Sequence, residues 1–85
     1  IERENDLYSF IYSELTPNQK KTLKYLKHTN GEKIFSAENL KNSSFTSSAL
    51  QSTIESLLYK DVIDRKDDVY FFTDPFFKLW LESYI

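Results

Sequence analysis

The chain of 85 residues contains no cysteine, no methionine, one glycine and two prolines. Without cysteine it cannot form a disulfide, a thiolate metal site or a thiol nucleophile, so its stability must come from packing. No apolar run approaches the roughly 18 residues that span a bilayer, and residues 1–10 are too acidic for a signal peptide. We therefore expect a cytoplasmic chain that does not enter a membrane. Because Ile1 is not an initiator methionine, we also expect a segment excised from a longer protein.

The remaining composition predicts one packed domain over residues 1–85. Hydrophobic residues make up 40% of the chain and aromatic residues 16%, which excludes disordered and low-complexity classes. The 11 Lys and Arg residues and 13 Asp and Glu residues give a net charge of −2. A stand-alone nucleic-acid binder is usually strongly basic, so the overall charge alone does not identify a partner.

An amphipathic helix is predicted over residues 1–14. Its apolar side chains recur at three- and four-residue spacing. The face expected to enter the core consists of Leu7, Phe10, Ile11 and Leu15. The acidic side chains of its first turn suit the positive end of the helix dipole.

A second helix is predicted to begin after Thr16. Thr16 is its N-cap, Pro17 takes the first helical position, and Gln19 completes a capping box. The helix is expected to end near His28, because Asn30-Gly31 favours a left-handed stop. Its predicted core positions are Leu23 and Leu26.

Two further helices are predicted in the middle of the chain. Ile34-Phe35 reads as an extended stretch, a brief helix covers residues 37–41, and Asn42-Ser43-Ser44 breaks it. A longer helix covers residues 47–60, capped by Thr46 or Ser47. Its apolar face is formed by Leu50, Ile54, Leu57 and Leu58.

The last third of the chain predicts a hairpin and a terminal helix. Val62-Ile63 and residues 69–72 are β-branched or aromatic runs, joined by the polar residues 65–68. Asp74-Pro75 combines a cap with a proline and starts a helix over residues 75–85.

The order of elements predicts an α+β winged helix-turn-helix. Its core covers residues 16–72, between the preceding helix and the terminal helix. Ile34-Phe35 is expected to pair with the hairpin, which would make a small three-stranded antiparallel sheet.

Several strings of this sequence carry a family resemblance between Leu15 and Leu81. The most specific is Asp74-Pro75-Phe76-Phe77 with Trp80-Leu81, and the others are Leu15-Thr16 with Gln19, Leu57-Leu58, and Val69-Tyr70-Phe71-Phe72. With these strings the chain resembles the winged-helix domain that follows the ATPase core in a family of prokaryotic AAA+-like ATPases related to the STAND class.

The resemblance implies a parent protein that binds ATP. One glycine cannot supply a GxxxxGK[ST] phosphate loop, so ATP binding would lie outside these residues. Family members often carry glycine where the helix turns into the wing, and this chain has Asp61 there. Aspartate tolerates the left-handed conformation better than most residues, so we expect the turn to survive at modest cost.

The helix over residues 47–60 carries candidate contacts to nucleic acid. Opposite its core face it presents Ser48, Ser52, Glu55 and Tyr59, with Gln51 and Ser56 flanking them, and the candidate contacts are Ser47, Ser48, Gln51 and Ser52. Gln51 can pair with an adenine edge, and the hydroxyls can meet phosphates or bases. The alternative is a solvated or protein-facing surface, which the absence of Lys and Arg from this set favours.

A lysine stripe on the second helix is the strongest electrostatic feature. Lys20, Lys24 and Lys27 span about 60° of the helix circumference. Residues 16–33 contain five lysines and one glutamate, a local charge of +4. Such a stripe can bind a phosphate backbone or an acidic protein surface, and the alternative is an ordinary solvated face. Lys66 in the hairpin is a further candidate, although residues 60–74 carry a net −2 that argues against strong duplex contact.

No residue is predicted to be catalytic, cofactor-binding or metal-binding. His28 stands alone without cysteine or a second histidine, and it suits a cation at a helix C-terminus. We therefore expect this segment not to be an enzyme. The first hypothesis is a non-catalytic winged-helix module of an ATP-binding parent, docking onto other domains of that chain or onto a protein partner. The alternative is a winged helix that binds duplex DNA.

Overall fold

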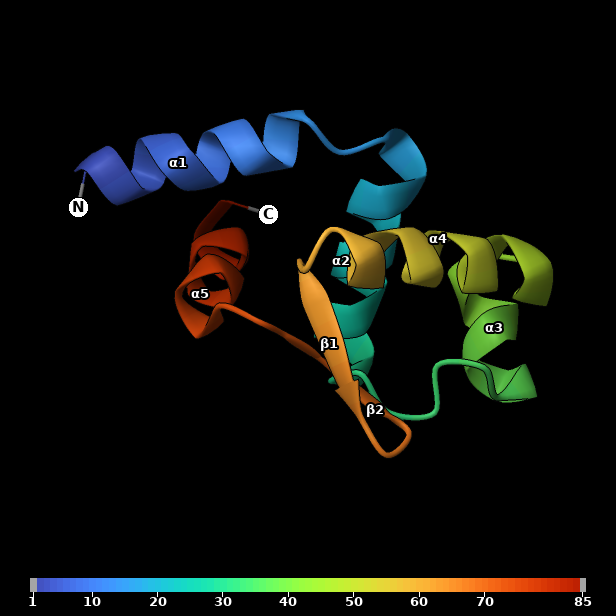
Figure 1. Cartoon of the computed structure of the whole chain (residues 1–85). Helices are drawn as coiled ribbons and strands as arrows, with labels where there is room; N and C mark the ends of the chain where they lie inside the picture. The colour runs from blue at the N-terminus through green and yellow to red at the C-terminus, as the bar shows by residue number, and fades with distance from the viewer. Residues whose placement is uncertain (1, 85) are drawn as a thin grey trace.

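The computed structural model describes the backbone of residues 2–84 and the side chains of residues 6–84. The outer ends of the two predicted terminal helices, at Ile1 and Ile85, lie outside the described residues. Within that range the elements are α1 (Glu2–Ser13), α2 (Pro17–Thr29), α3 (Ala37–Ser43), α4 (Ser47–Tyr59), β1 (Ile63–Lys66), β2 (Val69–Phe72) and α5 (Pro75–Tyr84). Figure 1 shows α1 and α5 side by side at one end of the domain and α3 at the other.

The helices begin where local side chains satisfy their free backbone N–H groups. The Oγ1 of Thr16 accepts from Gln19 N at 3.1 Å, and Gln19 Oε1 accepts from Thr16 N at 2.9 Å, which confirms the predicted capping box. Thr46, the first of the two residues considered, caps α4 by accepting from Ala49 N at 3.1 Å. Asp74 caps α5 through its bond from Phe76 N. These interactions are local, so the sequence predicted them well.

The observed turns lie within two residues of the positions predicted from the sequence. Asn30 ends α2 in the left-handed conformation at φ 57°, and Asp61 adopts φ 62° where the resemblance placed a glycine. The predicted break at Asn42 is displaced, because α3 continues to Ser43 before Ser44 turns left-handed. The hairpin is tighter than predicted, because residues 65 and 66 belong to β1 and its turn is Asp67-Asp68.

The sheet has two antiparallel strands in the described residues, so the predicted three-stranded sheet is wrong. β1 and β2 pair from Ile63↔Phe72 to Lys66↔Val69. The stretch before α3 approaches β2 through one backbone bond, from Tyr70 N to the Gly31 carbonyl at 3.0 Å. Gly31 at φ 73° and Lys33 at φ 50° then turn the chain away, because a left-handed backbone cannot continue a strand. Ile34 enters the core as a side chain anchor instead, with 2% exposure.

The core is formed where α2 packs against α4 and the hairpin closes one side. It consists of Tyr8, Leu15, Leu23, Leu26, Ile34, Leu50, Ile54, Leu57, Ile63, Tyr70, Phe72, Phe77 and Leu81. A buried polar contact joins the two helices, because Gln19 Nε2 donates to Ser56 Oγ at 2.9 Å. The amide of Gln19 therefore serves both the cap of α2 and the position of α4.

Helix α1 is rotated from the predicted orientation. Leu7 and Phe10 were expected in the core but are 55% and 62% exposed, whereas Tyr8 is 8% exposed. Aromatic packing on α5 accounts for the rotation: the Tyr8 and Phe77 ring centres lie 5.4 Å apart, and those of Tyr12 and Trp80 lie 5.9 Å apart. Tyrosines four residues apart share a helix face, so both rings reach α5 when Leu7 and Phe10 turn to solvent. The other two predicted positions do pack inward, because Leu15 is buried and Ile11 packs against the core.

The loop that takes the place of the third strand is tied to α2 by Tyr25. Its hydroxyl donates to the Ile34 carbonyl at 2.7 Å, and burial raises its pKa above the ordinary value of 10.0. We expect Tyr25→Phe to lower the free energy of unfolding by about 1 kcal/mol at neutral pH, because it removes this one hydrogen bond. Urea unfolding followed by circular dichroism measures the change.

The pH dependence of the stability difference between the wild type and Tyr25→Phe tests the role assigned to the Tyr25 hydroxyl. The pKa of Tyr25 is higher in the folded state than in the unfolded state, so its contribution is complete below pH 10 and is lost as the pH rises through the raised folded value. The difference between the wild type and Tyr25→Phe should therefore shrink above pH 10. A difference that stays constant through this range would contradict the assigned role of the hydroxyl.

Candidate functional site

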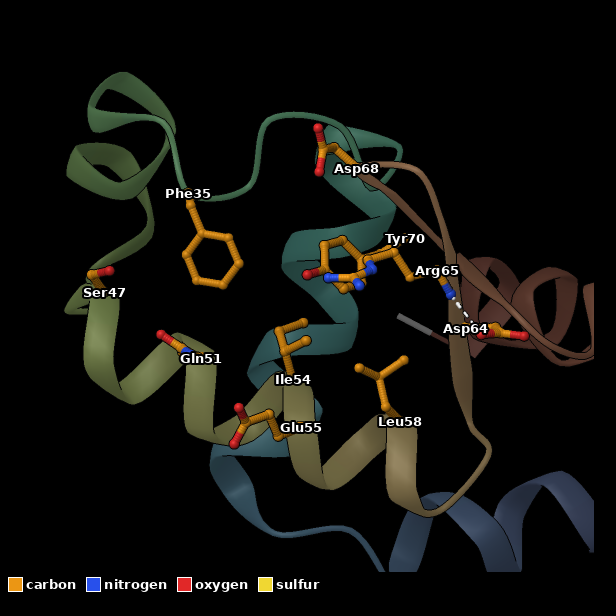
Figure 2. A pocket seen from close by; sticks show the side chains of 10 residues that line it. All are labelled: Phe35, Ser47, Gln51, Ile54, Glu55, Leu58, Asp64, Arg65, Asp68 and Tyr70. Atoms are coloured by element: carbon orange, nitrogen blue, oxygen red, sulfur yellow. Dashed lines mark hydrogen bonds between the residues drawn. The ribbon is translucent and has the colours of Figure 1, made fainter.

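An open groove of about 700 Å³ lies between α4 and the β1–β2 hairpin, and we call it the α4–hairpin groove. Figure 2 shows its walls, which come from α4, from the hairpin and from the loop before α3. The lining residues are Phe35, Ser47, Gln51, Ile54, Glu55, Leu58, Asp64, Arg65, Asp68 and Tyr70. Three segments that are separate in the sequence therefore build one surface.

The packing of α4 decides which of its side chains reach this groove. Leu50, Thr53, Ile54 and Leu57 are its buried residues. At 100° per residue, Ser47, Gln51 and Leu58 fall at one border of the buried face, the border next to the hairpin. Ser48 and Ser52 lie farther round the helix and are exposed, outside the lining of the groove.

The floor of the groove is apolar. Ile54 and Tyr70 are 2% and 8% exposed and belong to the core, whereas Phe35 keeps 38% of its surface exposed. Leu58 packs against the core from α4 and is partly buried. In Figure 2 the Phe35 ring points into the groove from the loop before α3. The floor thus offers apolar surface that the domain itself does not fully cover.

The rim of the groove is acidic. Glu55 stands on α4, and Asp64 and Asp68 stand on the hairpin, while Arg65 is the one cationic residue of the lining. The lining therefore carries two more negative charges than positive charges. Asp64 Oδ1 accepts from the Arg65 backbone N–H at 2.8 Å, and its pairing with Phe71 places the Asp64 side chain on the face of the hairpin opposite to Tyr70. Figure 2 shows the Arg65 side chain extending from β1 across the groove.

The structure divides the predicted nucleic-acid residues among separate surfaces. Ser47 and Gln51 line the groove, Ser48 and Ser52 lie on the outer face of α4, and Lys66 is exposed at the end of β1. All the predicted α4 residues are exposed, as expected. Among the described side chains, no lysine lines the groove.

The lysine stripe of α2 lies on another side of the molecule. α2 turns its buried residues toward α4, whereas Lys20, Lys24 and Lys27 lie about a third of a turn away from that face. The Nζ of Lys20 lies 5.0 Å from the centre of the Tyr12 ring, so this first lysine of the stripe contacts α1. Lys21, beside the stripe, instead lies over Phe45 in the turn before α4, with its Nζ 5.3 Å from the ring centre.

Sequence reasoning missed the groove residues that come from the hairpin and the α3 loop. Phe35 was assigned to a strand, and the acidic hairpin was considered only as an argument against duplex contact. The alternation of β1 and β2 is a signal that could have found Arg65, because it lies opposite the buried Tyr70 in the register. The position of Phe35 follows from the left-handed turns at Gly31 and Lys33. The sequence indicated the first of these turns but gave no signal for the second.

A metal site or membrane segment has no support among the described residues. They contain no group of three or more His, Cys, Asp and Glu side chains arranged to hold a metal ion. Their helices are also too short and too polar for any of them to traverse a bilayer.

The helix-turn-helix unit α3–α4, followed by a two-stranded hairpin and packed against α2, defines a winged helix domain. A family model matches residues 6–83, and the chain belongs to that family, described as "Probable winged helix domain". Comparison with curated proteins and with solved structures returned no match.

Proposed function

We propose that this winged helix domain is a non-catalytic module of a larger ATP-binding protein, and that it docks onto another domain of that protein or onto a protein partner. The observation that carries the docking role is the charge of the α4–hairpin groove, with its three carboxylates and one guanidinium. The ATP-binding parent is supported by the family resemblance in the strings around Asp74-Pro75 and Trp80-Leu81.

The electrostatics of the groove favour a protein surface over duplex DNA. Affinity for duplex DNA comes largely from Lys and Arg side chains that neutralise phosphates. A duplex against α4 and the hairpin would bring its phosphates close to Glu55, Asp64 and Asp68. The lysines of α2 would not offset this repulsion inside the groove, because none of them belongs to its lining. A protein partner can match the carboxylates with its own cations.

Duplex DNA is the second candidate because the four predicted α4 residues are exposed. In this alternative Ser47, Ser48, Gln51 and Ser52 approach the bases. The phosphate contacts would come from Lys20, Lys24, Lys27 and Lys66. An amide such as that of Gln51 can form two hydrogen bonds with adenine.

Titration of fluorescently labelled duplex DNA with the domain separates the two candidates. We expect weak binding at about 50 mM salt that disappears at about 200 mM, because a few lysines give only a small counterion-release term. Lys20→Glu combined with Lys24→Glu should abolish the residual signal, and Glu14→Gln serves as an exposed control outside both surfaces. Tight binding that persists at the higher salt and is lost in the double variant would favour the DNA candidate and contradict the docking proposal. Binding that survives the double variant would mean that the lysine stripe does not supply the phosphate contacts.

Hydrogen exchange on the longer protein tests the link to nucleotide. We expect backbone protection in α1, α5 or the α4–hairpin groove to differ between the ATP-bound and nucleotide-free protein, because a docked surface exchanges more slowly. Identical protection of all three regions in both states would refute a nucleotide-dependent docking role.

A further inference from the structure

We infer that the α4–hairpin groove binds a segment of a partner protein that places lysine or arginine side chains on both sides of an aliphatic or aromatic anchor residue. This inference rests on the proposed docking function and names the surface and the chemistry of the partner. The groove combines an apolar floor with carboxylates on both walls, and these features specify different parts of the same ligand.

The floor specifies the anchor. Phe35, Ile54, Leu58 and Tyr70 meet there from the α3 loop, α4 and β2, and Phe35 and Leu58 leave apolar surface exposed to water. Covering this surface with an apolar side chain removes it from water, which is the main favourable term in helix-in-groove recognition. A groove of about 700 Å³ is large enough for side chains of a peptide segment, and it is open rather than enclosed.

The walls specify the cations. Glu55 projects from α4 and Asp68 stands at the hairpin turn, so one carboxylate stands on each side of the floor (Figure 2). Asp64 pairs with Phe71, and its side chain therefore lies on the face of the hairpin opposite to Tyr70. A segment lying along the groove would meet a carboxylate on either side of its anchor. The same carboxylates repel an acidic segment and disfavour the phosphates of a nucleic acid.

Arg65 supplies the one donor of opposite charge in the groove. Its side chain extends from β1 across the floor in Figure 2. A guanidinium in this place can donate to backbone carbonyls of the bound segment, which fixes the segment in position without requiring an acidic side chain. The partner is therefore basic overall but needs no particular acidic residue.

Model peptides in a binding titration test the inference on the 85-residue chain. The probes are a labelled amphipathic Lys-Leu peptide, a Lys-Ser peptide of the same length and charge, and a Glu-Leu peptide of the same apolar content. We expect the Lys-Leu peptide to bind most tightly and to shift the amide NMR signals of Gln51, Glu55 and Leu58. Equal binding of the Lys-Ser peptide would overturn the anchor, and equal binding of the Glu-Leu peptide would overturn the charge requirement.

Two pairs of variants locate the binding surface. The variant Glu55→Gln, Asp68→Asn removes the two carboxylates that flank the floor. The control variant Glu14→Gln, Glu38→Gln removes the same charge from exposed positions elsewhere. We expect the groove variant to weaken Lys-Leu binding about fivefold, as two partly screened charge pairs predict, and the control by less than about twofold.

The contribution of the apolar floor to peptide binding is tested by Phe35→Ala. The matched control is Phe76→Ala, which truncates an exposed phenylalanine of α5 outside the groove. We expect only Phe35→Ala to weaken binding, with circular dichroism verifying that both variants are folded. Absence of binding by the Lys-Leu peptide, or equal losses within either pair of variants, would overturn the inference. The hydrogen-exchange result on the longer protein is independent of these data, so a docking role through another surface would still be detected.

Discussion

Replacing Gly31 by alanine is expected to remove at least about 3 kcal/mol from the free energy of unfolding, a large part of the total for a domain of this size. Gly31 adopts φ 73°, where an L side chain costs about 1–2 kcal/mol. A β-carbon there would also lie 1.8 Å from the Tyr70 carbonyl oxygen, far inside van der Waals contact. The obstacle is backbone, because Tyr70 is held in β2 by its pairing with Arg65.

Relief of this clash would have to separate the loop from the hairpin. The Tyr70 N–H donates to the Gly31 carbonyl at 3.0 Å, so moving either segment breaks that bond as well. Guanidinium unfolding followed by Trp80 fluorescence measures the loss. Asn30→Ala is the matched control, since Asn30 also has a positive φ, 57°, but is exposed. If Gly31→Ala cost no more than Asn30→Ala, the close approach of the two backbones would be contradicted.

Gly31 also shows why part of the fold could be predicted and part could not. Asn30-Gly31 was recognised as a helix stop, because that signal depends on neighbouring residues alone. Its contact with Tyr70 depends on how the hairpin returns to α2, and no local pattern reports this. The caps at Thr16 and Thr46 were predicted correctly for the first reason, and the third strand was predicted wrongly for the second.

The candidate site also has a part that the sequence predicted and a part that it did not. The exposure of Ser47 and Gln51 on α4 followed from the helical period, because the core face of α4 was identified correctly. Whether the lysines of α2 accompany them depends on the packing of α2 on α4, which the sequence does not encode locally. Lys20 faces Tyr12 of α1, so the combined DNA surface that the sequence proposed is distributed over different faces.

The structure shows that acidic residues of the hairpin belong to the candidate site. In the sequence, Asp64 and Asp68 only weakened an expectation of duplex binding. In the structure Asp68 stands across an apolar floor from Glu55, and the turns at Gly31 and Lys33 bring Phe35 into the lining of the same groove. The loop that failed to become a strand therefore supplies a wall of the groove, and the departure from the predicted sheet creates the candidate site.

Leu23→Ala is expected to lower the free energy of unfolding by about 2–5 kcal/mol, because it empties a fully buried position between α2 and α4. Leu23 has 0% exposure and lies on the face of α2 that contacts α4. For a domain of this length each kcal/mol corresponds to about 4–8 °C in the melting temperature. Thermal unfolding followed by circular dichroism should therefore show a decrease of at least about 8 °C.

Leu7→Ala is the control that tests the rotation of α1. The periodicity of the sequence put Leu7 in the core together with Leu23, but Leu7 is 55% exposed. The same substitution there removes a side chain that is already largely in water, so we expect a loss of less than about 1 kcal/mol. A loss at Leu7 as large as that at Leu23 would mean that α1 buries Leu7. The packing of α1 on α5 through Tyr8 and Tyr12 would then be contradicted, because that orientation of the helix leaves Leu7 largely exposed.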